Sequence, residues 1–372
     1  MNKYNKILVI SAVNIVSGGA FTILNDFLNQ IKKNKDAENY KIIALVNSHD
    51  RLPIAENILY KNYKLPKKNW IFRIFYEYIY FFFVSLKLKP EIWISLHDMT
   101  PFVRSKYLYT YMHNPSPFFQ KREKLKLSFK FNLFVTFYKY LYKINVHRNT
   151  AVIVQQNWFR EKISQLCKLP SDRIIVSYPE FDCLPVKSDF EKGRFFFPSF
   201  PREFKNFEVI CEAAELLNKD ESFRQNCEIY LTIGGTENPY AESIYKKYKD
   251  NQYLHFTGLL GKEDMQMNYD KCECLIFPST LETWGLPISE FKPSGKKMLL
   301  ADLPYAHETA NNAKEAVFFE PYNSVQLANL IKVVCCNVIN EFAPVKIKDI
   351  NKPFCRNWQE LLNYILKGVS HE

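Results

Sequence analysis

The chain has 372 residues and a net charge of +11, and its whole excess of positive charge lies in the first half. Residues 1–186 hold 28 basic and 13 acidic side chains, a difference of +15, whereas residues 187–372 hold 22 and 26, a difference of −4. The 47% of hydrophobic residues exclude a disordered chain, and the length suggests two domains, each large enough to bury a core. No run of about 18 uncharged apolar residues occurs, so we expect no membrane-spanning helix.

The N-terminal apolar run and the cysteines both favour a cytoplasmic protein. Ile7–Ile10 follows two lysines, as in a secretory signal, but Asn14 interrupts the run and no small-residue cleavage site follows. A first β-strand is therefore the better interpretation. The nine cysteines have neither the spacing of zinc ligands nor an even-numbered framework, so we expect reduced core residues.

The first half alternates apolar strands with amphipathic helices. Lys6–Val13 is expected to be a buried strand, Asn14–Ala20 a loop that contains Gly18 and Gly19, and Phe21–Lys32 a helix with apolar residues at helical spacing. The other elements expected in this half are strands at 41–46, 92–96, 107–112, 151–154 and 174–177 and helices at 70–86 and 125–142.

The second half continues this alternation. The expected strands are 194–197, 229–233, 255–257, 275–278 and 298–301, and the expected helices are 206–218, 238–249, 262–271, 286–292, 325–338 and 358–366. Such alternation is typical of parallel sheets with helices on both faces, here two doubly wound Rossmann-like domains. Ligands of such sheets bind beyond the carboxyl ends of the strands, where eight of the ten glycines lie.

The clearest chemical signal is the segment 277–290, which reads FPSTLETWGLPISE. Glu282 lies in the loop after a strand, and Glu290 lies on the following helix. Gly285 lets the backbone approach a ligand just before the helix begins, where free N–H groups favour a phosphate. Two carboxylates beside a phosphate site suit a nucleotide sugar, whose hydroxyls they would bind. Taken singly, both glutamates could equally be solvated surface residues.

This segment resembles the Glu-x7-Glu signature of retaining glycosyltransferases of the GT-B fold, family 4, also called glycosyltransferase group 1. Members of this family occur in bacterial surface polysaccharide synthesis. The resemblance covers most of the chain, although Thr283 stands where the family usually has glycine. The other matching positions are the glycine pair Gly18-Gly19, His113 in YMHNPSPF, Arg202 and Lys205 in FPSFPREFKNF, the segment FTGLLGKEDM at 256–265, and Trp358 on the last helix.

The resemblance implies a GT-B architecture, in which two parallel sheets face a central cleft. Residues 1–186 would form an N-terminal acceptor-binding Rossmann-like domain. Residues 187–354 would form the C-terminal domain that binds the nucleotide-sugar donor. Residues 355–372 would form a C-terminal helix that packs back on the N-terminal domain.

The resemblance also implies the roles of individual residues. Arg202 and Lys205 would neutralise the leaving diphosphate, Glu282 would bind hydroxyls of the donor sugar, and Glu290 would bind the ribose hydroxyls. The catalytic set is then His113, Arg202, Lys205 and Glu282, and the donor-binding set is Gly18, Gly19, Thr257, Trp284, Gly285, Leu286 and Glu290. No Asp-x-Asp motif occurs, so we expect neither a metal nor a cofactor besides the substrate.

The implied function is the transfer of a hexose or deoxyhexose, with retention, from a nucleotide-diphosphate sugar to a glycan or a polyprenyl-diphosphate-linked acceptor in O-antigen or capsule assembly. No protein nucleophile is evident, which favours front-face displacement assisted by the leaving phosphate. Asp98 could be an acceptor-side base or a helix cap. The alternative functions are a GT-B-fold sugar-nucleotide epimerase or phosphorylase, and a non-catalytic carbohydrate-binding protein at the membrane surface.

Two segments, 60–89 and 121–148, combine basic and aromatic residues. Basic helices with aromatic faces can lie on anionic membranes, so we expect a cytoplasmic protein that is peripheral on the inner face of the cytoplasmic membrane. The alternative is that the aromatic residues face the core and the lysines are solvated. The chain has no recognisable nucleic-acid module, so we expect no nucleic-acid partner.

Overall fold

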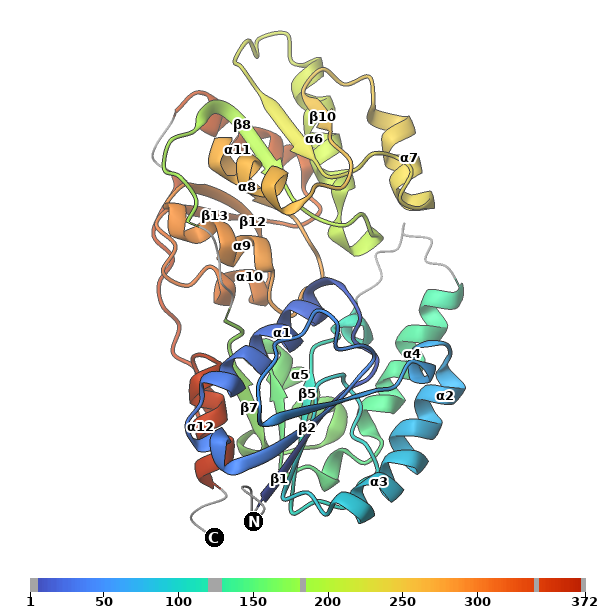
Figure 1. Cartoon of the computed structure of the whole chain (residues 1–372). Helices are drawn as coiled ribbons and strands as arrows, with labels where there is room; N and C mark the ends of the chain where they lie inside the picture. The colour runs from blue at the N-terminus through green and yellow to red at the C-terminus, as the bar shows by residue number, and fades with distance from the viewer. Residues whose placement is uncertain (1–5, 120–128, 181–184, 338–340, 369–372) are drawn as a thin grey trace. The chain divides into compact units, whose positions relative to one another are not determined.

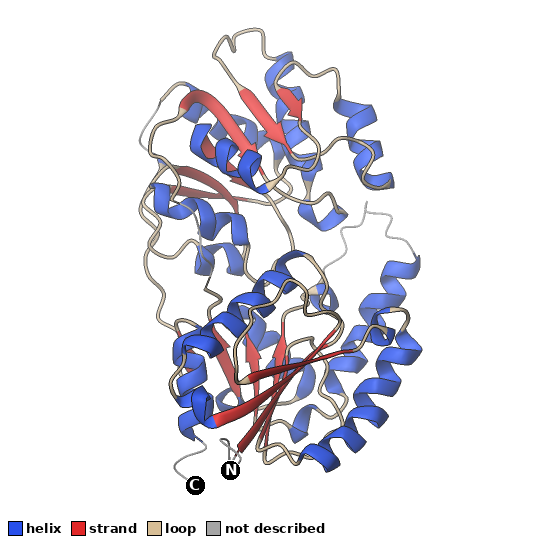
Figure 2. Ribbon diagram, viewed as in Figure 1, coloured by secondary structure: helices blue, strands red, loops and turns tan. Residues whose placement is uncertain are grey.

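The computed structural model describes residues 6–119, 129–180, 185–337 and 341–368. The chain divides into two units, of which unit 1 comprises residues 1–181 and 350–372 and unit 2 comprises residues 182–349. Each unit is a parallel sheet with helices on both faces (Figures 1 and 2). Unit 1 is therefore discontinuous in sequence, because the chain returns to it after unit 2 is complete.

Unit 1 contains an eight-stranded sheet in which every neighbouring pair is parallel, in the order β14-β7-β6-β5-β4-β1-β2-β3. Its central strands are apolar and buried because helices cover both faces. The strands are β1 (Lys6–Ala12), β2 (Tyr40–Val46), β3 (Ile58–Asn62), β4 (Ile92–Ser95), β5 (Tyr107–Met112), β6 (Ala151–Val154), β7 (Ile174–Ser177) and β14 (Phe354–Cys355).

The helices of unit 1 pack on opposite faces of this sheet. Alternate residues of the strands divide between the two faces, so that Leu8 packs with α1 and α12 whereas Val9 packs with α3. The helices are α1 (Gly18–Lys33), α2 (Trp70–Phe75), α3 (Phe81–Leu88), α4 (Phe129–Lys143), α5 (Asn157–Cys167) and α12 (Trp358–Gly368). Over the described part of the chain, no helix has both the length and the apolar character needed to cross a bilayer.

Unit 2 contains a six-stranded parallel sheet in the order β10-β9-β8-β11-β12-β13. The strands are β8 (Glu191–Phe197), β9 (Glu228–Leu231), β10 (Leu254–Phe256), β11 (Cys272–Phe277), β12 (Lys297–Ala301) and β13 (Ala316–Phe319). The helices are α6 (Phe207–Lys219), α7 (Pro239–Tyr248), α8 (Lys262–Lys271), α9 (Leu286–Phe291), α10 (Pro304–Thr309) and α11 (Ser324–Cys335). The central strands β8 and β11 lie side by side, so the loops that follow them meet at one edge of the sheet.

The C-terminal part of the chain completes unit 1. β14 pairs with β7 in parallel, through Phe354 and Val176. In α12, Trp358 is fully buried, and its ring centroid lies 5.3 Å from that of Phe27 and 5.5 Å from that of Tyr111. The return to unit 1 begins at residue 350, before the expected helix, because β14 already belongs to the sheet of unit 1.

The predicted α/β class with parallel sheets is confirmed, but one local prediction is wrong. Gly18 and Gly19 were expected in a loop, whereas the structure places them in the first turn of α1. Burial of the apolar stripe of α1 fixes the position of this helix and outweighs the low helix propensity of glycine. Residues 121–128 of the second basic segment lie outside the described residues.

Candidate functional site

Two loops are fastened together at the carboxyl edge of the unit 2 sheet. The loop after β8 contains Phe204, whose carbonyl oxygen accepts a hydrogen bond of 2.8 Å from the backbone N–H of Thr280, in the loop after β11. Asn206, which has a left-handed φ of 58°, donates from its side-chain amide to the carbonyl of Pro278 at 3.3 Å. These contacts hold the two loops in a fixed register at the edge where ligands of parallel sheets bind.

The predicted basic and acidic side chains of unit 2 lie on these loops. The ammonium of Lys205 donates to the carboxylate of Glu282, and the two side chains are 18% and 16% exposed. Arg202 precedes a 3-10 turn at Glu203–Lys205 and is exposed. Its guanidinium carbon lies 5.6 Å from the ring centroid of Phe200. The structure therefore brings Lys205 and Glu282 into contact and places Arg202 at the exposed start of the same turn.

Tyr305 on α10 supports the loop that carries Glu282. Its hydroxyl donates to the carbonyl of Ser279 at 2.6 Å. Burial, and next the negative charge of Glu282, raise the pKa of Tyr305 well above its ordinary value. The hydroxyl is therefore protonated at neutral pH and available as a donor. Sequence reasoning missed Tyr305, because it lies on a separate element and carries no motif of its own.

The turn between this loop and α9 depends on glycine. Gly285 has a left-handed φ of 83°, and a Cβ atom there would lie 3.3 Å from Cδ1 of Ile288. Trp284 is only 8% exposed, and its indole N–H donates to Oγ of Ser289 at 2.8 Å. The indole is thus packed inside unit 2, whereas Leu286 is half-buried at the first position of α9.

Glu290 on α9 is joined to α8. Its Oε2 accepts a hydrogen bond of 2.7 Å from the hydroxyl of Tyr269, which is 4% exposed. This bond connects α9, which carries Glu290, with α8, which begins within the segment 256–265. Tyr269 was not predicted as a site residue; its one sequence signal is that it lies a helical turn beyond Met265.

Thr257 and the glycine turn after β9 lie at the same edge of the sheet. Thr257 is exposed, and its hydroxyl lies 3.1 Å from the carbonyl oxygen of Leu231. The N–H groups of Gly234 and Gly235 donate to the carboxylate of Glu237 at 2.6 and 2.9 Å. A carboxylate of the chain itself therefore occupies the donors of this glycine turn.

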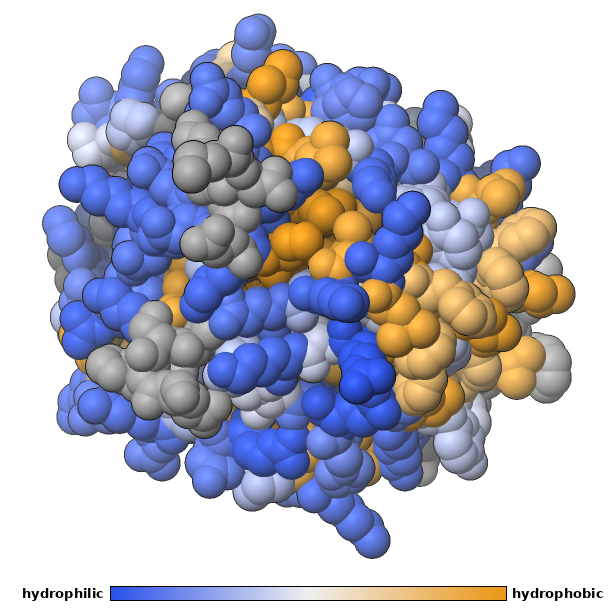
Figure 3. All heavy atoms as spheres, turned by 60° about the horizontal axis from the view of Figure 1, so that its bottom comes forward, coloured by the Kyte–Doolittle hydropathy of each residue, from blue (hydrophilic) through white to orange (hydrophobic). Residues whose placement is uncertain are grey.

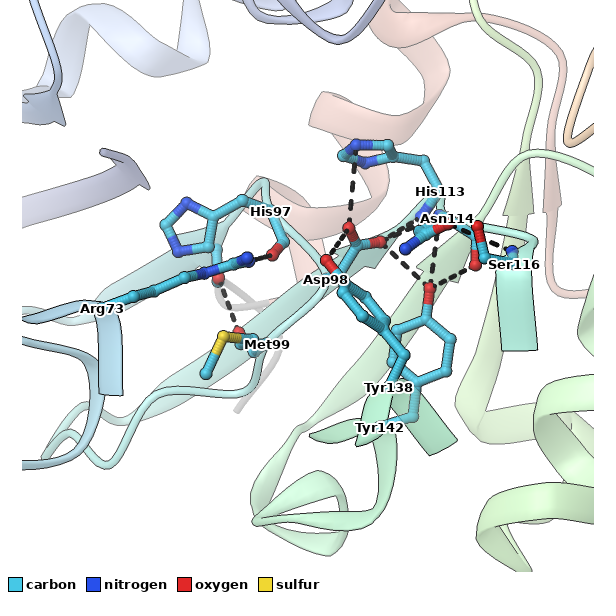
Figure 4. Close-up of polar contacts among 10 residues, drawn as sticks. Arg73, His97, Asp98, Met99, His113, Asn114, Ser116, Tyr138 and Tyr142 are labelled. Carbon is cyan, nitrogen blue, oxygen red and sulfur yellow. Dashed lines mark hydrogen bonds and ion pairs between the residues drawn. The ribbon is translucent and has the colours of Figure 1, made fainter. Parts of the chain in front are cut away.

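In unit 1, Asp98 organises the loop that carries His113 (Figure 4). Asp98 is 4% exposed and has a left-handed φ of 72°. Its Oδ1 accepts hydrogen bonds from the backbone N–H groups of His113 at 2.7 Å and Asn114 at 3.0 Å. Nε2 of His113 lies 3.8 Å from Oδ2 of Asp98. The carboxylate thus faces the loop after β5, and these contacts give it a positioning role toward His113.

Two buried tyrosines of α4 complete the surroundings of Asp98. The hydroxyl of Tyr142 donates to Oδ1 of Asp98 at 3.1 Å, and that of Tyr138 lies 3.4 Å from Oδ2. Burial, and next the charge of Asp98, raise the pKa of both tyrosines. Both hydroxyls therefore stay protonated and can donate to the carboxylate. The sequence points to Asp98 and His113 singly, but not to Tyr138 and Tyr142, which join them from a separate helix.

The predicted site residues form two sets, one in each unit. In unit 1, Gly18 and Gly19 follow β1 and His113 follows β5, at the carboxyl edge of one sheet. The glycine pair is exposed, and an added Cβ on Gly18 would have no neighbour within 4 Å. The set of unit 2 is the one described above. Among the residues that the structure describes, no group of three His, Cys, Asp or Glu side chains is arranged to hold a metal ion.

Comparison with known proteins relates unit 2 to a family. Residues 187–337 match the family model described as glycosyl transferases group 1. Over 249 residues the chain is 22% identical to the O-antigen chain mannosyltransferase RfbU of Salmonella typhimurium. That match covers 64% of this chain and 59% of RfbU, so the chain spans less than two thirds of the length of this relative.

Solved structures show the fold of the whole chain. TarM superposes with a TM-score of 0.64 at 10% identity, over 100% of this chain and 97% of TarM. Anabaena HepE in complex with UDP-glucose superposes with a TM-score of 0.60 at 13% identity, over 98% of each chain. The expected GT-B fold is therefore confirmed, as two parallel α/β sheets and a C-terminal helix.

Proposed function

We propose that this chain, whose residues 187–337 form a domain of glycosyltransferase group 1, is a retaining glycosyltransferase that uses a nucleotide-diphosphate sugar. It moves a hexose or deoxyhexose to a glycan or a polyprenyl-diphosphate-linked acceptor, in the assembly of an O-antigen or a capsule. The reaction takes place at the inner face of the cytoplasmic membrane. RfbU, an O-antigen chain mannosyltransferase, and HepE, solved with UDP-glucose, support this class of donor and product.

The contact between Lys205 and Glu282 is the observation that carries the proposal. It places a cation and a hydroxyl acceptor side by side at a ligand-binding edge of unit 2. When a donor binds, its diphosphate takes Lys205 and Arg202 as partners, because phosphate oxygens are strong acceptors for both cations. Glu282 is then released to accept hydrogen bonds from hydroxyls of the sugar.

Glu290 binds the ribose of the donor. It already accepts one hydrogen bond, from Tyr269, which fixes the carboxylate on α9 and leaves its other oxygen for a ribose hydroxyl. The exposed Thr257 lies at the same edge and is proposed to lie beside the base. Gly285 and Leu286 bring the start of α9 close to the diphosphate, and the buried Trp284 supports this turn through its hydrogen bond to Ser289.

Unit 1 contributes the acceptor side and two donor contacts. Gly18 and Gly19 offer exposed backbone at the start of α1 for the phosphates, and His113 contacts the transferred sugar. The bond between the anomeric carbon and the diphosphate oxygen breaks while the acceptor oxygen attacks from the same face. The acceptor proton passes to the leaving phosphate, and Arg202 and Lys205 stabilise the negative charge that develops there.

A thermal-shift screen followed by a turnover assay tests this proposal. We expect UDP, GDP or one of their sugar conjugates to raise the melting temperature, because a ligand that binds only the folded state stabilises it. Glu290→Ala should lose most of this shift. The matched control Glu221→Ala, an exposed carboxylate elsewhere in unit 2, should keep it.

The turnover assay separates the remaining functions. A radiolabelled sugar that appears on an acceptor with retained configuration supports the proposal. A changed sugar nucleotide in the absence of acceptor indicates an epimerase, and phosphate-dependent release of sugar phosphate indicates a phosphorylase. Normal donor binding without turnover on any acceptor favours a non-catalytic carbohydrate-binding protein, and absence of any nucleotide-induced shift contradicts the donor site.

A further inference from the structure

The helical segment Trp70–Leu88, formed by α2, a π-helical turn at Tyr76–Tyr80 and α3, packs Phe81 on the core but also buries charged and polar side chains and exposes large apolar ones. A surface helix normally buries its apolar stripe and exposes its polar one. Here the buried stripe recurs every four residues and consists of Arg73, Glu77, Phe81 and Ser85, which are 4%, 0%, 0% and 0% exposed. The opposite stripe consists of Ile71, Phe75, Ile79 and Phe83, which are 79%, 44%, 50% and 62% exposed.

Polar contacts help to hold this segment in its orientation. Arg73 donates to the carbonyl of His97 at 2.8 Å, and Oε1 of Glu77 lies 2.5 Å from Nε2 of His97. Oγ of Ser85 accepts from the backbone N–H of Arg104 at 2.8 Å. Rotating the helix to bury its isoleucines would leave these charged and polar groups without their partners, at a high cost. The outward apolar stripe is therefore a stable property of the fold.

The apolar surface continues onto α4. Leu133, Tyr140 and Ile144 are 60%, 62% and 41% exposed. The ring of Trp70 packs edge-on against Phe137 at a centroid distance of 5.2 Å, which joins the start of α2 to α4. Figure 3 shows hydrophobic side chains gathered at the right of the view, on the side where α2, α3 and α4 lie in Figure 1. An exposed apolar patch of this kind marks an interaction site.

The charges around this patch identify the partner. Lys64, Lys67 and Lys68 precede the segment and Lys87 and Lys89 end it, and all five are exposed. Glu77 is the one acidic residue between positions 61 and 89, and it is fully buried. Two copies of the chain paired through this face would bring lysines opposite lysines, since both ends are basic. An anionic lipid bilayer accepts both the apolar stripe and the lysines.

We propose that the outward face of Trp70–Leu88, with the exposed residues of α4, docks on an anionic bilayer. Ile71, Phe75, Ile79 and Phe83 enter the boundary between headgroups and acyl chains, and the lysines at both ends contact anionic headgroups. This docking deepens the proposed function. It rests on that function in one respect, namely that the acceptor is anchored in lipid. Docking itself requires no donor and no turnover, so it can be tested separately.

Vesicle co-sedimentation of the full chain tests the proposal. We expect binding to phosphatidylcholine vesicles with about 30% phosphatidylglycerol, and little binding to pure phosphatidylcholine. The double variant Ile71→Ser/Ile79→Ser should bind about tenfold more weakly, because it removes two inserting side chains. The control Ile54→Ser/Val325→Ser changes residues that are 84% and 58% exposed, outside this segment, and should bind like wild type.

A charge series separates the lysines from the apolar stripe. Replacing Lys64, Lys67 and Lys68 by Gln should weaken binding to the anionic vesicles about tenfold, and added salt should weaken wild-type binding in the same direction. The control replaces Lys246, Lys247 and Lys249, at the end of α7, by Gln; it removes the same charge and should leave binding unchanged.

Three outcomes overturn the proposal. The proposal is wrong if the wild-type protein does not bind anionic vesicles. It is also wrong if the Ile71→Ser/Ile79→Ser variant binds them as well as the wild-type protein does. If analytical ultracentrifugation shows a dimer for the wild-type protein and a monomer for this double variant, the surface is a self-interface instead. Nucleotide-induced melting shifts, measured on the same samples, report folding and the donor site; a loss of vesicle binding with intact shifts is therefore a failure of docking alone.

Discussion

Lys205 and Glu282 hold the donor site in shape without a ligand. Each neutralises the other, so neither charge is left unpaired on partly buried loops. An exposed ion pair contributes about 0–1 kcal/mol, and a partly buried one somewhat more. A ligand of micromolar affinity has a binding free energy of about 8 kcal/mol, far above this contribution. A nucleotide diphosphate can therefore replace Glu282 as the partner of Lys205.

Two substitutions in the proposed donor site should separate binding from catalysis. Arg202→Ala should lower kcat by about a hundredfold and affect donor affinity less, because its guanidinium acts mainly on charge that develops as the diphosphate leaves. Glu290→Ala should mainly raise the Kd of the nucleotide, because the ribose contact exists before and during the reaction. Steady-state kinetics and calorimetry measure the two effects, and unchanged values in both variants would refute the site.

Asp98 provides a test of positioning in unit 1. Asp98→Asn keeps an oxygen acceptor and tolerates the left-handed backbone, but it removes the charge that faces His113. We expect kcat to fall about ten- to hundredfold through misplacement of His113, with an unchanged KM for the donor. If urea denaturation shows lower stability while kcat stays the same, Asp98 has only a structural role.

At the level of single residues, sequence reasoning predicts members of a site better than their partners. Lys205 and Glu282 lie in recognisable motifs, and they are in contact. Tyr269 and Tyr305 lie in no motif, because each contributes a single hydroxyl, and the packing of helices and loops determines its partner. Asp98 and His113 were singled out, but their contact with the tyrosines of α4 was not, since burial of a carboxylate is not visible in the surrounding sequence.

Among the elements, β8 depends on one glycine. Gly193 has a left-handed φ of 75°, at a place where the pairing of β8 with β11 shifts register. A Cβ atom there would lie 2.1 Å from the carbonyl oxygen of Asn226. The backbone N–H of Gly193 donates to Glu273 at 2.8 Å, so the bulge is also held by a side chain of β11.

Gly193→Ala should therefore destabilise the protein by about 2–4 kcal/mol, through backbone strain and the clash with Asn226. Gly261→Ala is the matched control, because its Cβ would meet no atom closer than 3.9 Å. The control should change the free energy of unfolding by less than about 1 kcal/mol. Urea denaturation measures both, and equal effects of the two substitutions would contradict this account of the bulge.

Strands in the middle of the sheets were predictable because burial on both faces requires a continuous apolar run. β3 and β14 were not predicted, since one is a partly exposed edge strand and the other has only two residues. β13, α5 and α10 were also missed.

The helical character of Trp70–Leu88 followed from the sequence, but its orientation did not. The segment is apolar on more than one face, so spacing alone does not say which face is buried. The structure buries the face of Phe81, and the contacts of Arg73, Glu77 and Ser85 add to this choice.

At the scale of the whole molecule, Trp358 ties the end of the chain to the core of unit 1. Trp358→Ala should lower the free energy of unfolding by about 3–5 kcal/mol, because it leaves a cavity between Phe27 and Tyr111. Tyr364→Ala, at a residue of the same helix that is 49% exposed, should cost less than about 1 kcal/mol. Calorimetry measures both variants, and a similar effect of the two would show that α12 is not anchored through Trp358.

The discontinuity of unit 1 also sets an order of events during protein synthesis. Domains fold as units while the chain leaves the ribosome, and unit 2 is contiguous, so it is complete once residue 349 has emerged. At that moment the sheet of unit 1 still lacks the strand beside β7, and the pocket between Phe27 and Tyr111 is empty of Trp358. The half that appears first is therefore finished last, and until residues 350–368 have emerged the nascent chain exposes an unpaired strand edge that chaperones can bind.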